Sequence, residues 1–428
     1  MSNHYKGLML ILDGIGDRAS PLFGGLTPLE KAATPNLDRL VSAGMCGLVD
    51  PLIPGVPVAT HTGTGALFGL APRDIHRLSR GPVEAAGIGM PGQPGDVFLR
   101  GNFATLERCG DELCILDRRA GRIREGVDDL VEGLKNIPLD QGITATIAPA
   151  TEHRIALRLS GPGLSATISD TDPGSWTQER NMVLSSHPLI SDDKASVRTA
   201  ELLNLCIHEV FVRLHDHPIN QRRITEGMPP ATGIITRGAG MALNLESFIN
   251  HLGLASAVIT GERTVAGLGR LLNCTVITDP RFTGSTDTDL AAKVSAARDA
   301  LDSHDFVFLH IKATDIYSHD RDPKGKRAVL EQIDHALGPL LDQELVIGVT
   351  GDHSTDCNTG RHCGEPVPSL LYAPYGRRDS VNTFGESECA RGGLGRIPSH
   401  SFLYSILDNM GYLHQYQPAD WKFFKPRT

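Results

Sequence analysis

Three short apolar segments of this chain each run directly into a cluster of aspartate, histidine or lysine side chains. The segments are 8–12, 306–311 and 345–350, and the clusters that follow them begin at Asp13, Lys312 and Asp352. Continuous apolar runs of this length are typical of buried parallel strands. A segment with helical spacing, 327–341, separates the last two strands. This order predicts an open α/β sheet, in which functional groups lie at the carboxyl ends of the strands.

The middle of the chain has a different pattern, in which glycine and proline punctuate arginine-rich strands such as 153–159. A longer helical pattern follows over 195–215. A chain of 428 residues is long enough for more than one hydrophobic core. We therefore predict one discontinuous α/β domain, made of residues 1–74 and 232–428, and a smaller inserted α/β domain that binds substrate, residues 75–231.

Composition limits the partners of this chain. The formal net charge of −9 argues against nucleic acid or an acidic membrane as the main partner, and is compatible with a small anionic substrate. The apolar run near the start has only about six residues, so we expect no signal peptide and no transmembrane helix. The eight cysteines are scattered, which is typical of mostly reduced thiols in a cytoplasmic protein. The sequence gives no prediction of oligomeric state.

Candidate metal ligands fall into three separated groups. They are Asp13, then Asp315 with His319 in the segment KATDIYSHD, then Asp352-His353 followed by His362. Carboxylates and imidazoles can hold two divalent ions about 4 Å apart, which clamp a phosphoryl group and activate a hydroxyl between them. Each group alone has an ordinary alternative, such as a turn at Asp13-Gly14 or a helix cap at Asp315. Together, at the ends of neighbouring strands, they predict a two-metal site.

The order of these motifs resembles that of the archaeal-type cofactor-independent phosphoglycerate mutases of the alkaline phosphatase superfamily. The matching segments span nearly the whole chain: LDGIGDRAS, TPLEKAATPNLDRL, RGPVEAAGIG, GDVFLRGNFATL, DRRAGRI, HIKATDIYSHD, GDHST and GGLGRIPSH. The resemblance implies a doubly wound alkaline-phosphatase-like domain. It also implies a glycolytic isomerase that interconverts 2- and 3-phosphoglycerate by phosphoryl transfer.

The same resemblance assigns the metal ligands. One divalent ion would be bound by Asp13, the nucleophile, Asp352 and His353. The other would be bound by Asp315, His319 and His362. Manganese, magnesium, cobalt and zinc all serve this family, and the ligand set is compatible with each of them.

The family's phosphorylated hydroxyl residue corresponds to Thr60, in the segment VPVATHTGTGALFG. A hydroxyl bound to a metal ion ionises near neutral pH, and threonine differs from serine here only in its bulk. We therefore expect a phospho-threonine intermediate at Thr60, with Thr62 as the alternative. Another interpretation makes this segment a helix start, in which Thr62 and Thr64 accept hydrogen bonds from helix amides.

Two residues depart from the family pattern. His61 follows the nucleophile, where the family usually has an acidic residue. Ala266 stands where the family has a lysine that helps to neutralise the phosphoryl group in transit, although Lys312 is present. The departures favour an alternative, a phosphohydrolase or a mutase-like enzyme specialised for another phosphorylated or phosphonate acid. A third hypothesis is a non-catalytic binding protein of the same fold.

Arginine binds phosphate and carboxylate through two parallel hydrogen bonds, and the predicted insert is rich in arginine. The residues that the resemblance assigns to substrate binding are Asp117, Arg118, Arg119, Arg122, His153, Arg154, Asn220, Arg223, Arg237 and Lys312. The ordinary alternative is that arginines on a strand face form surface salt bridges.

Overall fold

The computed structural model describes residues 4–174 and 182–413. The chain divides into two compact units: unit 1 is Met1–His76 with Leu245–Thr428, and unit 2 is Arg77–Asn244. The second boundary lies further along the chain than predicted, because strand β8 (Gly233–Met241) pairs with β3 (Val97–Cys109) of unit 2. The predicted boundary assigned Arg237 to the larger domain, but this residue lies in the sheet of unit 2.

Unit 1 is built on an eight-stranded sheet. Its spatial order is β10 (Thr275–Ile277), β9 (Ser256–Ile259), β11 (Phe306–Ile311), β1 (Lys6–Leu12), β12 (Leu345–Thr350), β15 (Val367–Tyr372), β2 (Met45–Asp50) and β16 (Gly395–Pro398). The first five strands run parallel to one another, and β15 is antiparallel to both of its neighbours. This mixed sheet confirms the predicted α/β class.

The three strands that end in polar clusters lie side by side at the centre of this sheet. Strands β11 and β12 have the bounds that their apolar runs predict, and β1 lies between them. In the register, Leu12 is opposite Ile311 and Ile11 is opposite Thr350. The residues that follow the three strands therefore emerge together at one edge of the sheet.

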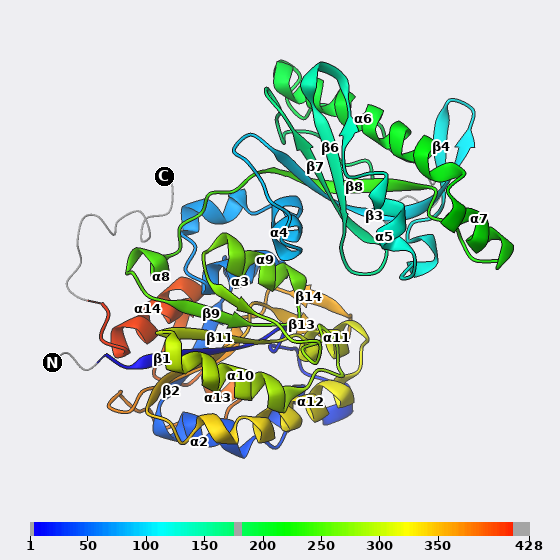
Figure 1. Ribbon diagram of the computed structural model, residues 1–428. Coiled ribbons are helices and arrows are strands. Elements are labelled where there is room, and N and C mark those ends of the chain that lie inside the picture. Colours follow the sequence, from blue (N-terminus) through cyan, green and yellow to red (C-terminus); the bar gives the residue numbers. More distant parts are fainter. Residues whose placement is uncertain (1–3, 175–181, 414–428) are drawn as a thin grey trace. The chain divides into compact units, whose positions relative to one another are not determined.

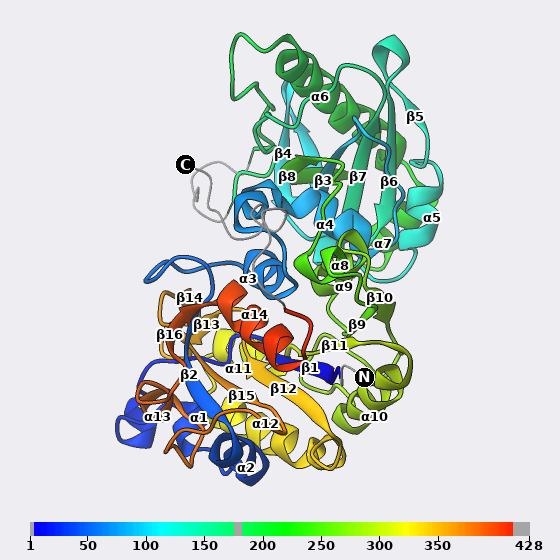
Figure 2. The same ribbon diagram turned by 90° about the vertical axis from the view of Figure 1, so that its left-hand side faces the viewer.

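Helices cover both faces of the sheet in unit 1 (Figures 1 and 2). One face carries α2 (Pro35–Ala43), α10 (Leu290–Ser303) and α12 (Pro323–Ala336), whose apolar side chains share a core with Leu8, Leu10 and Leu12 of β1. The other face carries α3 (Thr60–Leu67), α9 (Arg263–Leu271) and α14 (Ser399–Asn409). The shorter elements are α1 (Pro28–Lys31), α8 (Phe248–His251), α11 (Ala313–His319) and α13 (Glu386–Cys389), with the hairpin β13 (Ser354–Asp356) and β14 (Arg361–Cys363). A three-layer α/β/α unit results, which is the predicted doubly wound arrangement.

Unit 2 is an antiparallel sheet with helices. Its strands are β8, β3, β7 (Arg154–Ser160), β6 (Thr144–Pro149) and β5 (Ile137–Pro138), and β4 (Glu112–Asp117) continues from β3 in a hairpin. Its helices are α4 (Arg80–Gly87), α5 (Val127–Glu132), α6 (Lys194–His215) and α7 (Pro218–Thr225). The buried face of α6, including Leu203, Ile207 and Val210, shares a core with the sheet.

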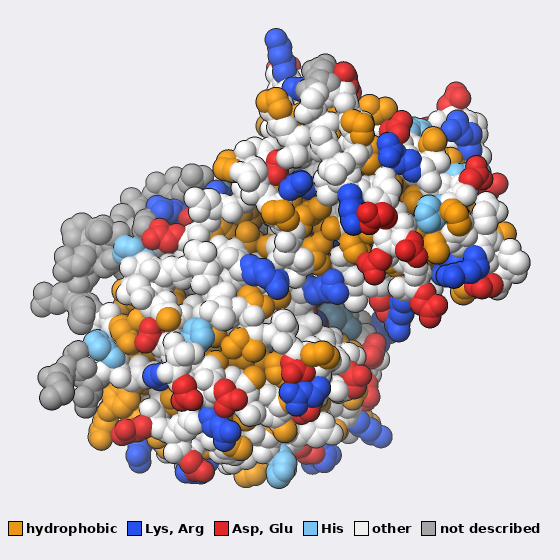
Figure 3. Space-filling view, viewed as in Figure 1, with side chains coloured by type: hydrophobic (Ala, Val, Ile, Leu, Met, Phe, Trp, Pro, Cys, Tyr) orange, Lys and Arg blue, Asp and Glu red, His pale blue; other side chains and the backbone are white. Residues whose placement is uncertain are grey.

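Two general expectations can be compared with this fold. Cys109 and Cys114 are joined by a disulfide across the β3–β4 hairpin, while the other six cysteines are free and buried. Among the described helices, none has the length and apolar content needed to cross a membrane. Basic and acidic side chains are interspersed on the face drawn in Figure 3.

Candidate active site

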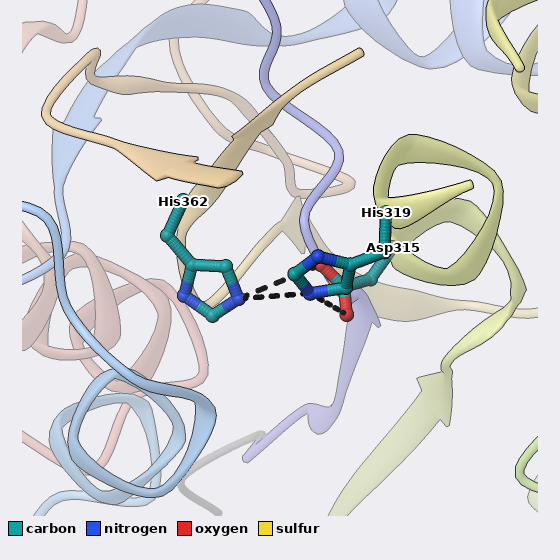
Figure 4. A group of neighbouring side chains, drawn as sticks. All are labelled: Asp315, His319 and His362. Atoms are coloured by element: carbon teal, nitrogen blue, oxygen red, sulfur yellow. Dashed lines mark hydrogen bonds and ion pairs between the residues drawn. The ribbon is translucent and has the colours of Figure 1, made fainter. Parts of the chain in front are cut away.

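Six of the predicted metal ligands come together at the carboxyl edge of the unit 1 sheet, in two groups of three. One group is Asp13, Asp352 and His353, and the other is Asp315, His319 and His362; within each, the ligand atoms lie within 4.8 Å of one another. Figure 4 shows the second group, with His319 and Asp315 on one helix facing His362 on a strand. The groups adjoin, because the rings of His353 and His362 stack with their centroids 3.7 Å apart.

Local structure explains how these side chains are positioned. Asp315 and His319 are four residues apart in α11, so both lie on one face of that helix. The β13–β14 hairpin places His362 opposite Thr355, close to the end of β12. Helix α3 packs closely against the loop after β12, since a Cβ on Gly63 would lie 1.9 Å from the Asp352 carbonyl oxygen. Thr60, the first residue of α3, is thereby held at the same edge.

Hydrogen bonds fix the orientation of all three histidines. His319 Nδ1 donates to the Gly360 carbonyl at 2.8 Å, and His362 Nδ1 donates to the Val58 carbonyl at 2.7 Å. His353 Nδ1 donates to Thr355 Oγ1 at 3.0 Å, because the Thr355 hydroxyl donates its own proton to Asp315 Oδ1 at 2.7 Å. Each Nε2 therefore faces the cluster, and a neutral imidazole in this tautomer offers its Nε2 lone pair to a metal ion.

The carboxylates are placed as metal ligands require. Asp13 and Asp352 are fully buried, and Asp13 Oδ1 accepts no hydrogen bond among the described residues. Its close neighbour is His353 Nε2, 3.2 Å away, a second atom of the kind that binds metal. Buried anionic oxygens without hydrogen-bond donors are costly unless a cation compensates them. The oxygen and imidazole donors of both groups thus fit divalent ions.

The buried carboxylates and imidazoles of the cluster shift one another's pKa values. Burial, and then the nearby Asp13 carboxylate, raise the pKa of Asp352 to about 6. Burial opposes the charge of His353, but Asp352 and Asp13 outweigh it and raise the pKa of His353 to about 9. Burial and the charge of His353 lower the pKa of His362 to about 4. Protons thus compensate the buried carboxylates, and a divalent cation would displace them.

Thr60 and Lys312 lie where the two groups meet. Thr60 Oγ1 is 3.3 Å from His353 Nε2 and 3.5 Å from Lys312 Nζ. Lys312 Nζ pairs with Asp13 Oδ2 at 3.0 Å and with Asp315 Oδ2 at 2.6 Å. Burial disfavours the charge of this ammonium, yet the two carboxylates hold the pKa of Lys312 above its usual value. A permanent cation therefore stands beside the candidate nucleophile.

The alternative interpretation of the threonine-rich segment is not what the structure shows. The Thr62 hydroxyl donates to the Ala59 carbonyl at 2.7 Å, and the Thr64 hydroxyl donates to Asp352 Oδ2 at 3.3 Å. Neither hydroxyl caps a helix amide, and α3 has no side-chain cap. Ala266, at the departure from the family pattern, is buried within α9.

An open pocket of about 630 Å³ borders His362 in unit 1. Its lining includes Arg18, Arg321 and Arg361. Arg18 is paired with Glu365 at 3.2 Å. The His362 edge of the cluster is therefore accessible from solvent.

Unit 2 carries a separate cluster of arginines on one face of its sheet. Arg100 of β3 is directly opposite Arg237 of β8, and Asn102, two residues along β3, is opposite Arg154 of β7. Since residues two apart on a strand share a face, these three arginines lie on the same side. Arg80 of helix α4 belongs to the same cluster, because its charge helps to lower the pKa of Arg100. We call Arg80, Arg100, Arg154 and Arg237 the arginine cluster.

The arginine cluster is short of negative charge. Its nearest carboxylate is Glu84, whose Oε2 is 4.0 Å from Arg100 Nε. Burial and the charges of the other three arginines, only partly offset by Glu84, lower the pKa of Arg100 to about 10. Arg100 Nε and the nearby His153 Nδ1 are buried without a hydrogen-bond partner among the described residues. Burial and the charge of Arg154 lower the pKa of His153 to about 4. An anionic ligand would relieve this repulsion.

Other residues expected to bind substrate have partners inside unit 2. Asn220 is fully buried and bonds the backbone of Leu214 and Ala231. Arg223 donates to the carbonyls of Pro229 and Ala120, both at 3.0 Å. These contacts hold the chain around α7.

The DRRAGR segment divides in the same way. Asp117 accepts hydrogen bonds from the backbone of Arg119 and Gly121, which closes a turn. Arg118 pairs with Asp172. Arg119 and Arg122 are exposed. Arg80 and Arg100, which complete the arginine cluster, stand outside the candidate set. The pairing of β3 with β8 brings Arg100 beside Arg237, and helix α4 places Arg80 beside Gly238 of β8.

Comparisons with known proteins identify the family of this chain. The model of the metalloenzyme superfamily matches residues 5–409. The chain is 40% identical over 410 residues to the 2,3-bisphosphoglycerate-independent phosphoglycerate mutase of Methanopyrus kandleri, covering 94% of this chain and 96% of that one. It is 39% identical over 406 residues to mutase 1 of Archaeoglobus fulgidus, covering 94% and 97%.

Two solved structures share the fold. One is the PH0037 protein from Pyrococcus horikoshii, with a TM-score of 0.82, 32% identity and coverage of 97% of this chain and 99% of that one. The other is the cofactor-independent phosphoglycerate mutase from Thermoplasma acidophilum, with a TM-score of 0.71, 34% identity and coverage of 95% and 100%. The resemblance seen in the sequence motifs is thereby confirmed: the chain belongs to the metalloenzyme superfamily, and within it to the family of 2,3-bisphosphoglycerate-independent phosphoglycerate mutases.

Proposed function

We propose that this chain interconverts 2- and 3-phosphoglycerate by metal-dependent phosphoryl transfer through a phosphorylated Thr60. The observation that carries the proposal is the position of Thr60 Oγ1, within 3.5 Å of both His353 Nε2 and Lys312 Nζ, where the two groups of candidate metal ligands adjoin. The high identity to enzymes named as phosphoglycerate mutases supports the substrate.

We infer that Asp13, Thr60, Asp352 and His353 hold one divalent ion and that Asp315, His319 and His362 hold the other. Such ions supply two effects, a lower pKa for a hydroxyl bound to them and neutralisation of charge on the phosphoryl oxygens. Manganese, magnesium, cobalt and zinc all suit this mixture of carboxylate and imidazole donors.

The residues of the chain divide the reaction into two transfers. Thr60 Oγ1 loses its proton and forms a bond to phosphorus while the ester bond of the substrate breaks, and the departing oxygen of glycerate gains a proton. The other hydroxyl of glycerate then loses a proton and attacks phosphorus, and the bond to Thr60 breaks and Oγ1 is protonated again. Lys312 stabilises the negative charge that passes through Thr60 Oγ1 in both steps, because its ammonium lies 3.5 Å away. Each transfer thus releases one proton and takes up one proton.

We infer that the arginine cluster binds the carboxylate of the glycerate. Arg100, Arg154 and Arg237 share one face of the sheet, and burial of Arg100 lowers its pKa to about 10. His153 stays neutral at physiological pH because its pKa is about 4, so it can donate or accept a hydrogen bond from a substrate hydroxyl. Asn220 and Arg223 are left out of this set because of their internal hydrogen bonds.

The proposal is tested by phosphorus NMR. The protein is incubated with 3-phosphoglycerate and Mn²⁺, and the Mn²⁺ is removed before the spectrum is acquired. We expect a second phosphomonoester signal, that of 2-phosphoglycerate, to grow until the two isomers reach equilibrium. Growth of the inorganic phosphate signal alone would support the phosphohydrolase alternative. Unchanged spectra over long incubation with each of the four metals would contradict both.

Replacement of Arg154 by alanine tests the arginine cluster. We expect KM for phosphoglycerate to rise by about tenfold to a hundredfold, since a hydrogen bond to a charged group is worth about 1.5–3 kcal/mol. The melting temperature should change little. Arg223→Ala is the matched control, and it should lower the melting temperature without raising KM, because Arg223 bonds only backbone carbonyls among the described residues. The opposite pattern in the two variants would show that the assignments are reversed.

A further inference from the structure

Lys326 of α12 has a completely buried ammonium group. Burying a charge is costly unless it is both paired and hydrogen-bonded. Its Nζ donates to the Gly14 carbonyl at 2.8 Å and to the Gly16 carbonyl at 3.3 Å, both in the loop after β1. It also donates to the Thr355 carbonyl of β13 at 3.3 Å. One side chain therefore ties together two loops that are more than three hundred residues apart in sequence.

Asp17 completes this connection. Its Oδ2 is 2.9 Å from Lys326 Nζ, and its Oδ1 accepts a hydrogen bond from the Cys357 amide at 3.0 Å. Its own amide donates to Glu386 Oε1 at 3.2 Å. The carboxylate thus holds the loop after β1 to the residue that follows β13. The ammonium and the carboxylate neutralise each other, so they act on their surroundings through hydrogen bonds.

Three of the candidate metal ligands belong to these two segments, because Asp13 directly follows β1, and Asp352 and His353 directly precede β13. Asp13 immediately precedes Gly14, whose amide donates to Asp352 Oδ1 at 3.3 Å. Thr355 links His353 Nδ1 to Asp315 Oδ1 through its hydroxyl. Gly14 has a φ of +63°, and a Cβ there would lie 2.7 Å from Asp315 Oδ1. Two of the three backbone carbonyls that Lys326 binds therefore belong to residues that contact candidate ligands directly, namely Gly14 and Thr355.

We propose that Lys326 and Asp17 are positioning residues, which fix these two loops so that both groups of ligands are arranged before the ions bind. The inference rests on the proposed two-metal function. Its physical basis is that the loops are ordered when the chain folds, so that metal binding does not have to supply the free energy of ordering them. The pair touches neither substrate nor metal ligand side chains, and its effect is on affinity for the ions.

Lys293 provides a matched control. It is also completely buried in unit 1, in helix α10, and its Nζ donates to the His310 carbonyl at 3.0 Å. The His310 ring lies 3.1 Å from Asp13 Oδ2, but the acceptor is the backbone carbonyl, within strand β11, whose position is already set by pairing with β1 and β9. Loss of either ammonium is expected to change stability, but only Lys326 connects the ligand-bearing loops.

The test compares Lys326→Met and Lys293→Met in the full chain, stripped of metal and titrated with Mn²⁺ by calorimetry and electron paramagnetic resonance. We expect Lys326→Met to weaken Mn²⁺ binding by about tenfold to a hundredfold. Its kcat should recover at high Mn²⁺. Lys293→Met should keep the wild-type Mn²⁺ affinity. Asp17→Asn preserves the shape of the side chain and should also weaken Mn²⁺ binding. It replaces Lys326→Met in the test if that variant does not fold.

Two results would overturn the inference, and they are distinguishable. Wild-type Mn²⁺ affinity in folded Lys326→Met or Asp17→Asn, together with a lower melting temperature, would show that the pair only stabilises the fold. Absence of Mn²⁺ binding to the wild-type chain, repeated with magnesium, cobalt and zinc, would overturn the two-metal proposal and the positioning role with it.

Discussion

Thr60→Ala is expected to reduce turnover by at least about a thousandfold, since the variant lacks the oxygen that accepts the phosphoryl group. Thr60→Ser should keep measurable activity because a hydroxyl remains at the same position. Metal content should be largely retained in both variants, because the six carboxylate and imidazole donors are unchanged. The measurements are a steady-state assay with phosphoglycerate and elemental analysis of the purified proteins.

Thr62→Ala is the control for this prediction. Its hydroxyl bonds the Ala59 carbonyl within α3, so its removal should leave turnover close to that of the wild type. Mass spectrometry of a trapped intermediate should place the phosphate on Thr60. Phosphate on Thr62 or Thr64, or undiminished turnover in Thr60→Ala, would refute the assignment of the nucleophile.

The double change Asp315→Ala with His319→Ala is expected to lower the metal content from two ions per chain to one and to remove activity. These residues contribute two of the three ligands of one group, and a single histidine holds a divalent ion weakly. Elemental analysis after dialysis against Mn²⁺ measures the content. The fold should persist, because both side chains lie at the edge of the sheet and outside its apolar core.

Asp320→Ala is a suitable control for the double variant. This residue directly follows His319 at the end of α11 and is exposed. It should retain two ions and full activity. Two ions in the double variant would show that the second group is not a metal site.

The edge of the unit 1 sheet that carries the candidate metal ligands could be predicted from the sequence, because the sequence signals there are local. A fully buried parallel strand is a continuous apolar run, so 306–311 and 345–350 gave the bounds of β11 and β12 directly. The capping box that begins α1 is likewise a local signal, formed by Thr27 and Glu30 with Pro28 between them. Polar residues that follow such strands must share an edge if the strands are adjacent.

Helix α12 shows where local reasoning was incomplete. The predicted helix was 327–341, but the helix begins at Pro323, with Asp322 as its N-cap. The Asp-Pro pair is a helix start signal that the apolar spacing alone does not contain. The helix ends at Ala336, before Gly338-Pro339, which cannot continue it.

The arginine cluster depended on information that is not local. Arg100 and Arg237 become neighbours only through the pairing of β3 with β8, which also moves the boundary of unit 2 to Asn244. Asn220 and Arg223 have side chains of the types that often bind substrates. Their hydrogen-bond partners, however, are backbone groups that tertiary packing brings to them. A polar side chain in a motif does not reveal whether its partner is a ligand or the chain itself.

The position of β1 between β11 and β12 has a consequence for biosynthesis. During translation the first strand emerges long before the two strands that flank it, which begin at Phe306 and Leu345. Unit 2, in contrast, contains all the partners of its own sheet within Arg77–Asn244 and can fold while the rest is being made. The apolar β1 therefore stays unpaired until β11 and β12 have been synthesised. An unpaired apolar strand of this kind can bind chaperones or aggregate. A chain truncated before residue 345 would contain all of unit 2 but would lack β12 and the candidate ligands Asp352, His353 and His362.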